Sequence, residues 1–181
     1  MITYQTERLI LTSMRPEHTA ELFQLHADPV VQKIIYDNTP QTIEDVRKWV
    51  ERSLAQWRKN GFGTWIVYEK CSDGPVFIGR CGLRDHADTN NIELSTSLVE
   101  RGVGRGLGLE AARFAITHAL RSSTKEKVVG LIRHCNLRSQ RAATKLGLRY
   151  IDDRWHDGRF YQYYEMTREE YFSQPGHGVP R

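Results

Sequence analysis

The chain has 181 residues, a length that suits one domain with a sizeable core. Hydrophobic residues make up 39% of the sequence and charged residues 27%, which excludes an intrinsically disordered chain. The net charge of +4 comes from 26 basic and 22 acidic residues that are scattered along the chain, so the charge pattern favours a mixed, solvated surface over a nucleic-acid-binding tract.

Signals for export, membrane insertion and disulfide bonding are missing from the sequence. No apolar run reaches the length needed to cross a bilayer, and residues 1–8 lack the basic and apolar regions of an export signal. The three cysteines, Cys71, Cys81 and Cys135, are odd in number and widely spaced, which disfavours a disulfide framework and a cysteine zinc site. We therefore expect a cytoplasmic protein with no metal and no membrane partner.

The first half of the chain predicts one strand followed by helices. Arg8–Met14 alternates apolar and polar residues in part, as a half-buried strand does. Arg15-Pro16-Glu17 then opens a helix, and Val30–Ile35 predicts a short second one. Thr42 caps a longer helix, which ends at Asn60-Gly61.

The second half predicts strands first and alternating helices and strands afterwards. Three adjacent candidates predict antiparallel hairpins: strands 64–69, 76–83 and 91–98. After Arg101 the pattern alternates: helix 107–120, strand 127–132, helix 137–146, strands 149–155 and 159–166, and a capped helix start at Thr167. We expect a single domain over residues 1–172 and a loose C-terminal tail over residues 173–181, which carries Pro and Gly.

Four glycines alternate between the strand 91–98 and the helix 107–120: Gly102, Gly104, Gly106 and Gly108. Without a Cβ, such residues let backbone N–H groups turn toward a ligand, and the helix that follows adds free N–H groups and a positive dipole end. This arrangement suits a pyrophosphate better than it suits a flexible surface turn. A Walker loop is excluded because Leu109 and Glu110 stand where Lys and Ser or Thr would follow. A Rossmann fingerprint is excluded because hairpin-type strands precede the loop and no acidic residue ends the next strand.

The sequence resembles the GNAT superfamily of N-acetyltransferases, and within it the RimJ/RimL-like branch of ribosomal-protein N-acetyltransferases. The segment Glu93–Ala112 carries the strongest likeness. Four further segments are similar in order and spacing: Thr6–Leu11, Phe77–Leu83, Asn136–Leu148 and Tyr164–Tyr171. The resemblance implies an α/β fold, in which helices flank a mixed, mostly antiparallel sheet of about seven strands that is splayed at its middle. Acetyl-CoA would bind in the splay, and an amine would enter from the opposite side.

The resemblance also implies a set of cofactor-binding residues. The family's pyrophosphate loop falls on six consecutive residues: Val103, Gly104, Arg105, Gly106, Leu107 and Gly108. Val103 departs from the usual Gln or Arg, and Arg101 offers a second, overlapping register for the motif. The backbone of Leu98 and Val99 would pair with the pantetheine arm. The side chain of Asn136 would reach the cofactor, although a helix N-cap explains this residue nearly as well.

Two residues are candidates for the proton transfers. Glu93, between Ile92 and Leu94 on the strand that leads to the loop, is the candidate general base, against the reading of a surface strand carboxylate. In this branch Ser139, three residues after Asn136, matches the group that acts on the leaving thiolate, against the reading of an ordinary helix residue. Many GNAT enzymes have a Tyr where this chain has Ala143, so other tyrosines stay as alternatives: Tyr150, Tyr161 and Tyr163.

Some other residues attract attention for their chemistry. His134 and Cys135 are neighbours, and neighbours on a strand face opposite sides, so a Cys–His pair is disfavoured. Trp49 and Trp57 are more typical of a core than of an acceptor wall, whereas Trp65 stays open because its strand borders the acceptor side in similar proteins.

The sequence thus predicts an N-acetyltransferase that moves acetyl from acetyl-CoA to a primary amine, by preference the α-amine of a protein or peptide N-terminus. Alternatives are the acetylation of a small-molecule amine (an amino acid, a polyamine or an antibiotic) and a non-catalytic acyl-CoA-binding regulatory domain. Nucleic-acid binding is the least favoured function. A homodimer is compatible with the sequence.

Overall fold

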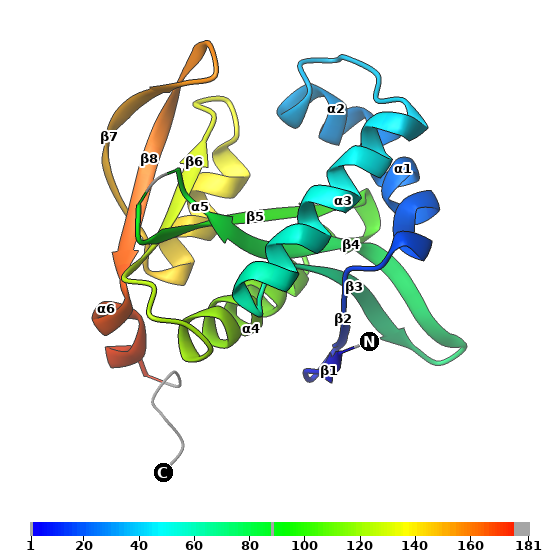
Figure 1. Cartoon of the computed structure of the whole chain (residues 1–181), viewed down its shortest axis with the longest axis horizontal. Coiled ribbons are helices and arrows are strands. Elements are labelled where there is room, and N and C mark those ends of the chain that lie inside the picture. The colour runs from blue at the N-terminus through cyan, green and yellow to red at the C-terminus, as the bar shows by residue number, and fades with distance from the viewer. Residues whose placement is uncertain (1, 88, 176–181) are drawn as a thin grey trace.

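A computed structural model describes residues 2–87 and 89–175 and contains one eight-stranded sheet with helices on both faces (Figure 1). In chain order the strands are β1 (Thr3–Gln5), β2 (Leu9–Ser13), β3 (Thr64–Cys71), β4 (Gly74–Asp85), β5 (Asn91–Leu98), β6 (Lys127–Ile132), β7 (Arg149–His156) and β8 (Arg159–Thr167). The helices are α1 (Thr19–Ala27), α2 (Pro29–Ile35), α3 (Ile43–Asn60), α4 (Leu107–Arg121), α5 (Leu137–Leu146) and α6 (Arg168–Ser173), with short 3₁₀ turns at Pro16–His18 and Glu100–Gly102.

The sheet is antiparallel except at its centre. Its strand order is β1-β2-β3-β4-β5-β6-β8-β7, and only β5 and β6 run parallel. Their pairing covers three residue pairs, from Asn91 opposite Lys127 to Glu93 opposite Val129. Beyond Glu93 the two strands diverge, as Figure 1 shows. The predicted mixed, largely antiparallel sheet with a splay at its middle is therefore confirmed.

The two faces of the sheet carry different helices. Helix α4 buries a stripe spaced by four residues, Leu107, Ala111, Ala115 and Ala119, against one face. Apolar residues of α1 and α3 pack on the other face around Ile66 of β3: Leu22, Leu25, Val46 and Val50. Side chains of β3 and β4 therefore point either toward α4 or toward α1 and α3.

The predicted helix ends are confirmed where a capping residue marks them. The Thr42 side chain accepts from the Asp45 N–H, and Asp45 in turn accepts from Thr42, so a capping box begins α3. Gly61 ends α3 with a left-handed φ of 69°. Asn136 caps α5 and Thr167 caps α6. The helix expected from Pro16 differs slightly, because its first turn is a 3₁₀ helix and the α-helix begins at Thr19.

The strand count exceeds the prediction by one. Strand β1 has three residues, all exposed, so it shows no alternation of burial that a sequence pattern could reveal. Trp65 of β3, for which a core position and an acceptor-wall position were both open, is 1% exposed and lies in the core. Of the predicted tail, residues 173–175 are described, and residues 176–181 lie outside the described part of the chain. The assignment of residues 1–172 to one domain stays a prediction.

Candidate active site

The splay leaves backbone groups of β5 without a strand partner. The His86 N–H donates to Asn91 O (3.0 Å) and the Val99 N–H donates to Ile78 O (2.9 Å). Hydrogen-bonded positions alternate in an antiparallel pair. These two bonds therefore mean that the odd-numbered residues of β5 direct their backbone N–H and C=O groups to β4. The N–H and C=O of Thr96 and Leu98 therefore point to the opposite edge, where β6 has diverged.

Leu98 and Val99, the two residues expected to pair with a pantetheine arm, direct their backbone groups to opposite edges of β5. Leu98 presents its backbone toward the splay. Val99 does not, since its N–H is bonded to Ile78 and its C=O accepts from Gly102 N at 2.9 Å. Of the two residues, Leu98 has the geometry for pairing with an extended ligand.

The glycine loop after β5 presents a run of free amides. Gly104 and Gly106 have φ values of 78° and 80°, a left-handed conformation that residues with a Cβ seldom adopt. Within the described residues, no hydrogen-bond acceptor meets the backbone N–H groups of residues 104–109. A Cβ on Gly104 would have open space around it, so the loop surface here is accessible. Val103 differs, because its N–H donates to Glu100 O at 3.0 Å.

Consecutive unpaired N–H groups at the start of the fifteen-residue helix α4 fit a pyrophosphate chemically. The free amides belong to five of the six residues expected to hold it: Gly104, Arg105, Gly106, Leu107 and Gly108. The residues present therefore match the phosphate portion of a CoA molecule, with the amides as donors and the helix dipole as the source of positive potential.

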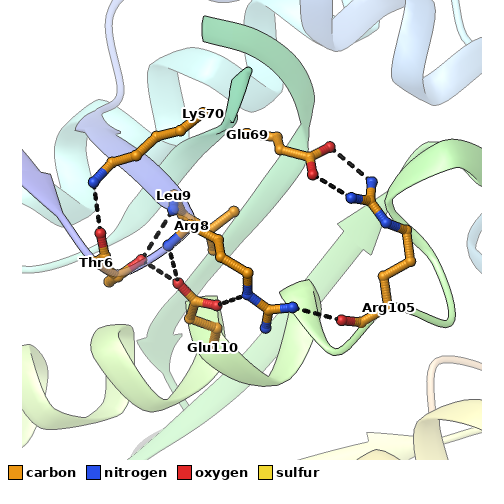
Figure 2. Close-up of polar contacts among 7 residues, drawn as sticks. All are labelled: Thr6, Arg8, Leu9, Glu69, Lys70, Arg105 and Glu110. Carbon is orange, nitrogen blue, oxygen red and sulfur yellow. Dashed lines mark hydrogen bonds and ion pairs between the residues drawn. The ribbon is translucent and has the colours of Figure 1, made fainter. Parts of the chain in front are cut away.

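A network of charged side chains anchors the glycine loop (Figure 2). The Arg105 guanidinium pairs with Glu69 of β3, with N–O distances of 2.8 and 2.5 Å. Arg8 donates to the backbone oxygen of Arg105 (2.8 Å) and to the carboxylate of Glu110 (2.7 Å), which also accepts from Thr6. The Arg105 side chain thus points to Glu69, as Figure 2 shows, so its contribution to the loop is anchoring.

The pKa shifts in this network agree with its contacts. The hydrogen bond from Arg105 holds the pKa of Glu69 below its ordinary value. Burial by itself raises the pKa of Glu110, but the hydrogen bonds from Thr6 and Arg8 outweigh it and lower that pKa. Both carboxylates are therefore ionised at neutral pH and keep the arginines in place.

The start of α5 lies at the same edge of the sheet as the glycine loop. Strands β5 and β6 are parallel, so their carboxyl ends, and the helices that follow them, share one edge. Asn136 accepts from Ser139 N at 3.2 Å, which establishes its N-cap role. Its side-chain NH₂ and the Ser139 hydroxyl have no hydrogen-bond partner in the described part of the chain, and both residues are partly exposed. Both groups are free to contact a ligand.

Glu93 stands where β5 and β6 separate. It belongs to the last residue pair of the two strands and is 8% exposed, so it is a buried carboxylate rather than a surface one. Arg84, opposite on β4, donates to both of its oxygens (2.9 and 3.3 Å), and His86 Nδ1 lies 3.5 Å from Oε2. The carboxylate has about four lone-pair sites, so these contacts leave room for one further donor.

The alternative tyrosines lie on β7 and β8. Tyr163 is 2% exposed, the Arg154 guanidinium lies 3.3 Å from its ring centroid, and burial raises its pKa. Its ring is 6.0 Å from that of His86, which places it in the surroundings of Glu93. Tyr150 instead donates to Asp153, and the Tyr161 ring contacts that of His156.

Sequence reasoning missed Arg84 and His86 as neighbours of Glu93. A signal was present, because Arg80, Arg84 and His86 are charged or titratable residues at even spacing in and just after an apolar strand, and even spacing puts side chains on one face. His134 pairs with Asp153 at 3.1 Å, and Cys135 is exposed. No group of three or more His, Cys, Asp or Glu side chains within residues 2–87 and 89–175 is arranged to hold a metal ion. No helix in those ranges is long and apolar enough to cross a membrane.

Residues 8–149 match the family model described as "Acetyltransferase (GNAT) domain". The chain belongs to the GNAT acetyltransferase family. This acetyltransferase is 28% identical over 148 residues to the uncharacterized protein YkkB of Bacillus subtilis (strain 168), an alignment that covers 80% of this chain and 84% of YkkB.

Two solved structures with the same fold were determined in complex with coenzyme A. One is RimL, a ribosomal L7/L12 alpha-N-protein acetyltransferase, with a TM-score of 0.75 and 15% identity over 92% of this chain and 98% of RimL. The other is the aminoglycoside acetyltransferase AAC(6')-Ib, with a TM-score of 0.74 and 18% identity over 90% of this chain and 96% of that protein. Family membership makes this acetyltransferase an acetyl-CoA-dependent N-acetyltransferase. These two relatives act on different acceptors, so the fold leaves the acceptor open.

Proposed function

We propose that this acetyltransferase acetylates the α-amine at the N-terminus of a protein or peptide. The observation that carries the proposal is the position of Glu93, a buried carboxylate at the point where β5 and β6 separate. A base must lie within hydrogen-bond reach of the amine, and the amine must meet the thioester in the splay. Glu93 is the carboxylate that β5 places at that point.

The loop and strand residues would bind acetyl-CoA. The free amides of Gly104–Gly108 hold the pyrophosphate, and Leu98 pairs with the pantetheine arm. The Asn136 amide group reaches the same arm from the start of α5. Exposed N–H groups on the splayed part of β5 polarise the thioester carbonyl, as an oxyanion hole does.

The reaction is a direct attack on the thioester. The amine nitrogen attacks the carbonyl carbon, so that a C–N bond forms and the C–S bond breaks. The proton of the amine passes to the Glu93 carboxylate, directly or through a water molecule. The Ser139 hydroxyl, which has no hydrogen-bond partner within the described ranges, stabilises or protonates the leaving thiolate.

The basicity of the acceptor favours an α-amine over lysine. An α-amino group has an ordinary pKa of about 7.7–8.0, against about 10.4 for lysine. Near a pH of about 7.5 a sizeable fraction of α-amines is already neutral, whereas only about one lysine in a thousand is. A site with one carboxylate as base therefore suits an α-amine. The resemblance to the RimJ/RimL-like branch and the shared fold with RimL support the same acceptor.

A small-molecule amine is the second candidate, and the shared fold with AAC(6')-Ib supports it. The two candidates are separated by measuring CoA release with three sets of acceptors: peptides with a free N-terminus, the same peptides blocked at the N-terminus but containing lysine, and small amines. We expect CoA release with the free peptides. Release only with small amines would favour the second candidate, and CoA binding without release for any amine would indicate a non-catalytic domain.

A further inference from the structure

A small cavity lies on the sheet face opposite α4, between α1 and α3. Its volume is about 150 Å³, and its lining includes His26 of α1, Tyr36 after α2, and Lys48, Trp49 and Arg52 of α3. A water molecule occupies about 30 Å³ of liquid, so the cavity has room for a carboxylate with a few carbon atoms.

A buried guanidinium lies beneath this cavity. Arg80 of β4 is 4% exposed, and its guanidinium carbon is 4.6 Å from the centroid of the Trp49 ring. Nη1 donates to Ser95 Oγ at 3.1 Å, whereas Nε is buried and has no acceptor within the described residues. No carboxylate in those residues forms an ion pair with Arg80. A buried positive charge without a counter-ion is costly, and an anion in the cavity would remove part of that cost.

His26 is a neutral residue in the cavity lining. Its Nδ1 lies 3.2 Å from the Tyr36 hydroxyl, which donates to it when the imidazole is neutral. Burial, together with the charge of Arg80, lowers the pKa of His26 to about 3, so the ring is neutral at physiological pH. The proton then resides on Nε2, which is buried and has no partner in the described part of the chain.

The charges around the cavity add to this positive character. Lys48 and Arg52 form no ion pair with any residue described in the structure. Asp45 is the carboxylate in the lining, but it is already occupied, since it accepts from the N–H (2.9 Å) and the hydroxyl (2.6 Å) of Thr42. The cavity therefore combines two cations and a third one beneath it, against one engaged carboxylate.

The cavity and Glu93 share one face of the sheet. Ser95, which binds Arg80, is two residues from Glu93 on β5, and Arg80 itself lies opposite Ser97, four residues from Glu93. At about 3.3 Å per residue these steps are roughly 7 and 13 Å. Arg80, beneath the cavity, therefore lies farther from Glu93 along the strands than the amine and carboxylate of one amino acid lie from each other. This distance corresponds to an acidic side chain one or two residues along an extended peptide, at about 3.3–3.6 Å per residue plus the side chain.

We infer that this cavity selects acceptors by binding the carboxylate of an acidic side chain at the second or third residue of the peptide. The inference rests on the proposed function, because it assumes that the amine is acetylated near Glu93. It adds the chemical class of the acceptor, which is an acidic N-terminal segment. The donors are Lys48 and Arg52, with the charge of Arg80 beneath them.

The test compares two amidated peptides, Ser-Asp-Glu-Ala-Gly and Ser-Asn-Gln-Ala-Gly, as acceptors. We expect kcat/KM to be at least about tenfold higher for the acidic peptide, mainly through a lower KM. Equal kcat/KM values would overturn the inference and leave the proposed function intact. Free glutamate tests the source of the carboxylate, and a kcat/KM for glutamate equal to that of the acidic peptide would overturn the peptide assignment.

Matched variants locate the effect in the cavity. Arg52→Gln should reduce the preference for the acidic peptide about tenfold, whereas Arg58→Gln, the same change at an exposed position of α3 outside the cavity lining, should preserve it. Arg80→Met should remove the preference as well. Arg52 is exposed, so its replacement tests the inference even if Arg80→Met fails to fold. A preference that survives in Arg52→Gln would contradict the role of the cavity.

A binding measurement separates failure of the inference from failure of the proposed function. Glutarate is titrated calorimetrically into the enzyme saturated with CoA, and no turnover is required. If neither peptide is acetylated, the proposed function fails, and glutarate still tests the cavity. We expect glutarate to bind the wild type and Arg58→Gln, and to bind Arg52→Gln about tenfold more weakly. Absence of glutarate binding to the wild type would overturn the anion site.

Discussion

Arg84 of β4 donates two hydrogen bonds to Glu93 of β5, at the point where β5 and β6 separate. The pair fixes the orientation of the carboxylate and joins β4 to β5, one of the two strands that border the splay. A carboxylate in such an ion pair can act as a base or as a structural group.

Glu93→Gln separates the two roles of this carboxylate. The amide keeps the shape of the side chain and removes the basic oxygen, so we expect kcat/KM to fall about a hundredfold, a typical contribution of a general base. Arg84→Gln is the control, because it breaks the same ion pair and keeps the base. If both variants lose activity equally, or if Glu93→Gln stays within about threefold of the wild type, Glu93 is a structural residue.

Gly106→Val tests the pyrophosphate loop. Gly106 has a φ of 80°, and forcing a residue with a Cβ into this region costs about 1–2 kcal/mol. Gly61→Val is the matched control, since Gly61 has a φ of 69° and ends α3 away from the loop. We expect a similar loss of Tm in both variants, and at least about tenfold weaker CoA binding, measured by calorimetry, in Gly106→Val alone. Unchanged CoA affinity would refute the loop assignment.

Ser139→Ala tests the leaving-group role. The substitution keeps the backbone N–H that donates to Asn136, so the cap of α5 is retained. We expect kcat to fall about tenfold while CoA affinity stays within about twofold, because the hydroxyl acts on the developing thiolate. Thr144→Ala, at the other end of α5, should change neither quantity. A normal kcat with weakened CoA binding would make Ser139 a positioning residue.

Asp37 gives the enzyme a pH-dependent contribution to stability. It accepts from Arg133 of the loop after β6 (2.6 Å) and from Arg159 of β8, and these contacts, Arg159 first, lower its pKa from 3.8 to about 2. A folded-state pKa below the unfolded value adds stability above about pH 4, and this contribution is lost as the pH falls toward about 2. We expect Asp37→Asn to lower Tm at pH 7, and the difference from the wild type to shrink as the pH falls toward about 2.

The control for this comparison is Asp73→Asn, because Asp73 is exposed and forms no ion pair with the residues that the structure describes. It should leave the difference in Tm between pH 7 and pH 2 unchanged. The ion pairs of Asp37 are exposed, so added salt should also reduce the effect of Asp37→Asn. A Tm difference that is as large at pH 2 as at pH 7 would show that Asp37 stabilises the fold by some other contact.

Local signals in the sequence predicted much of the fold. The bounds of β5, β6 and α5 agree with the structure, because turn and capping residues limit each element. Strand β1 was missed since three exposed residues carry no burial pattern. Strand β4 is longer than predicted because Gly74 and Pro75, which are typical of a turn, also pair with β3.

The site could be predicted from the sequence only where its groups lie close together along the chain. The free amides of the glycine loop follow from the spacing of glycines before a helix. The pairing of Arg84 with Glu93 depends on the register between β4 and β5, and the stacking of Trp49 on Arg80 depends on how α3 packs on the sheet. The anchoring role of the Arg105 side chain likewise required Glu69 to be placed beside it by the fold.

The most direct test of the proposed acceptor is to identify the acetylated atom. A single peptide with a free α-amine and one internal lysine is incubated with acetyl-CoA and the enzyme near pH 7.5, and the position of the acetyl group is determined by fragmentation mass spectrometry. We predict one acetyl group, on the α-amine, with a rate that falls about a hundredfold in Glu93→Gln. Acetylation of the lysine with an unmodified α-amine would contradict this prediction.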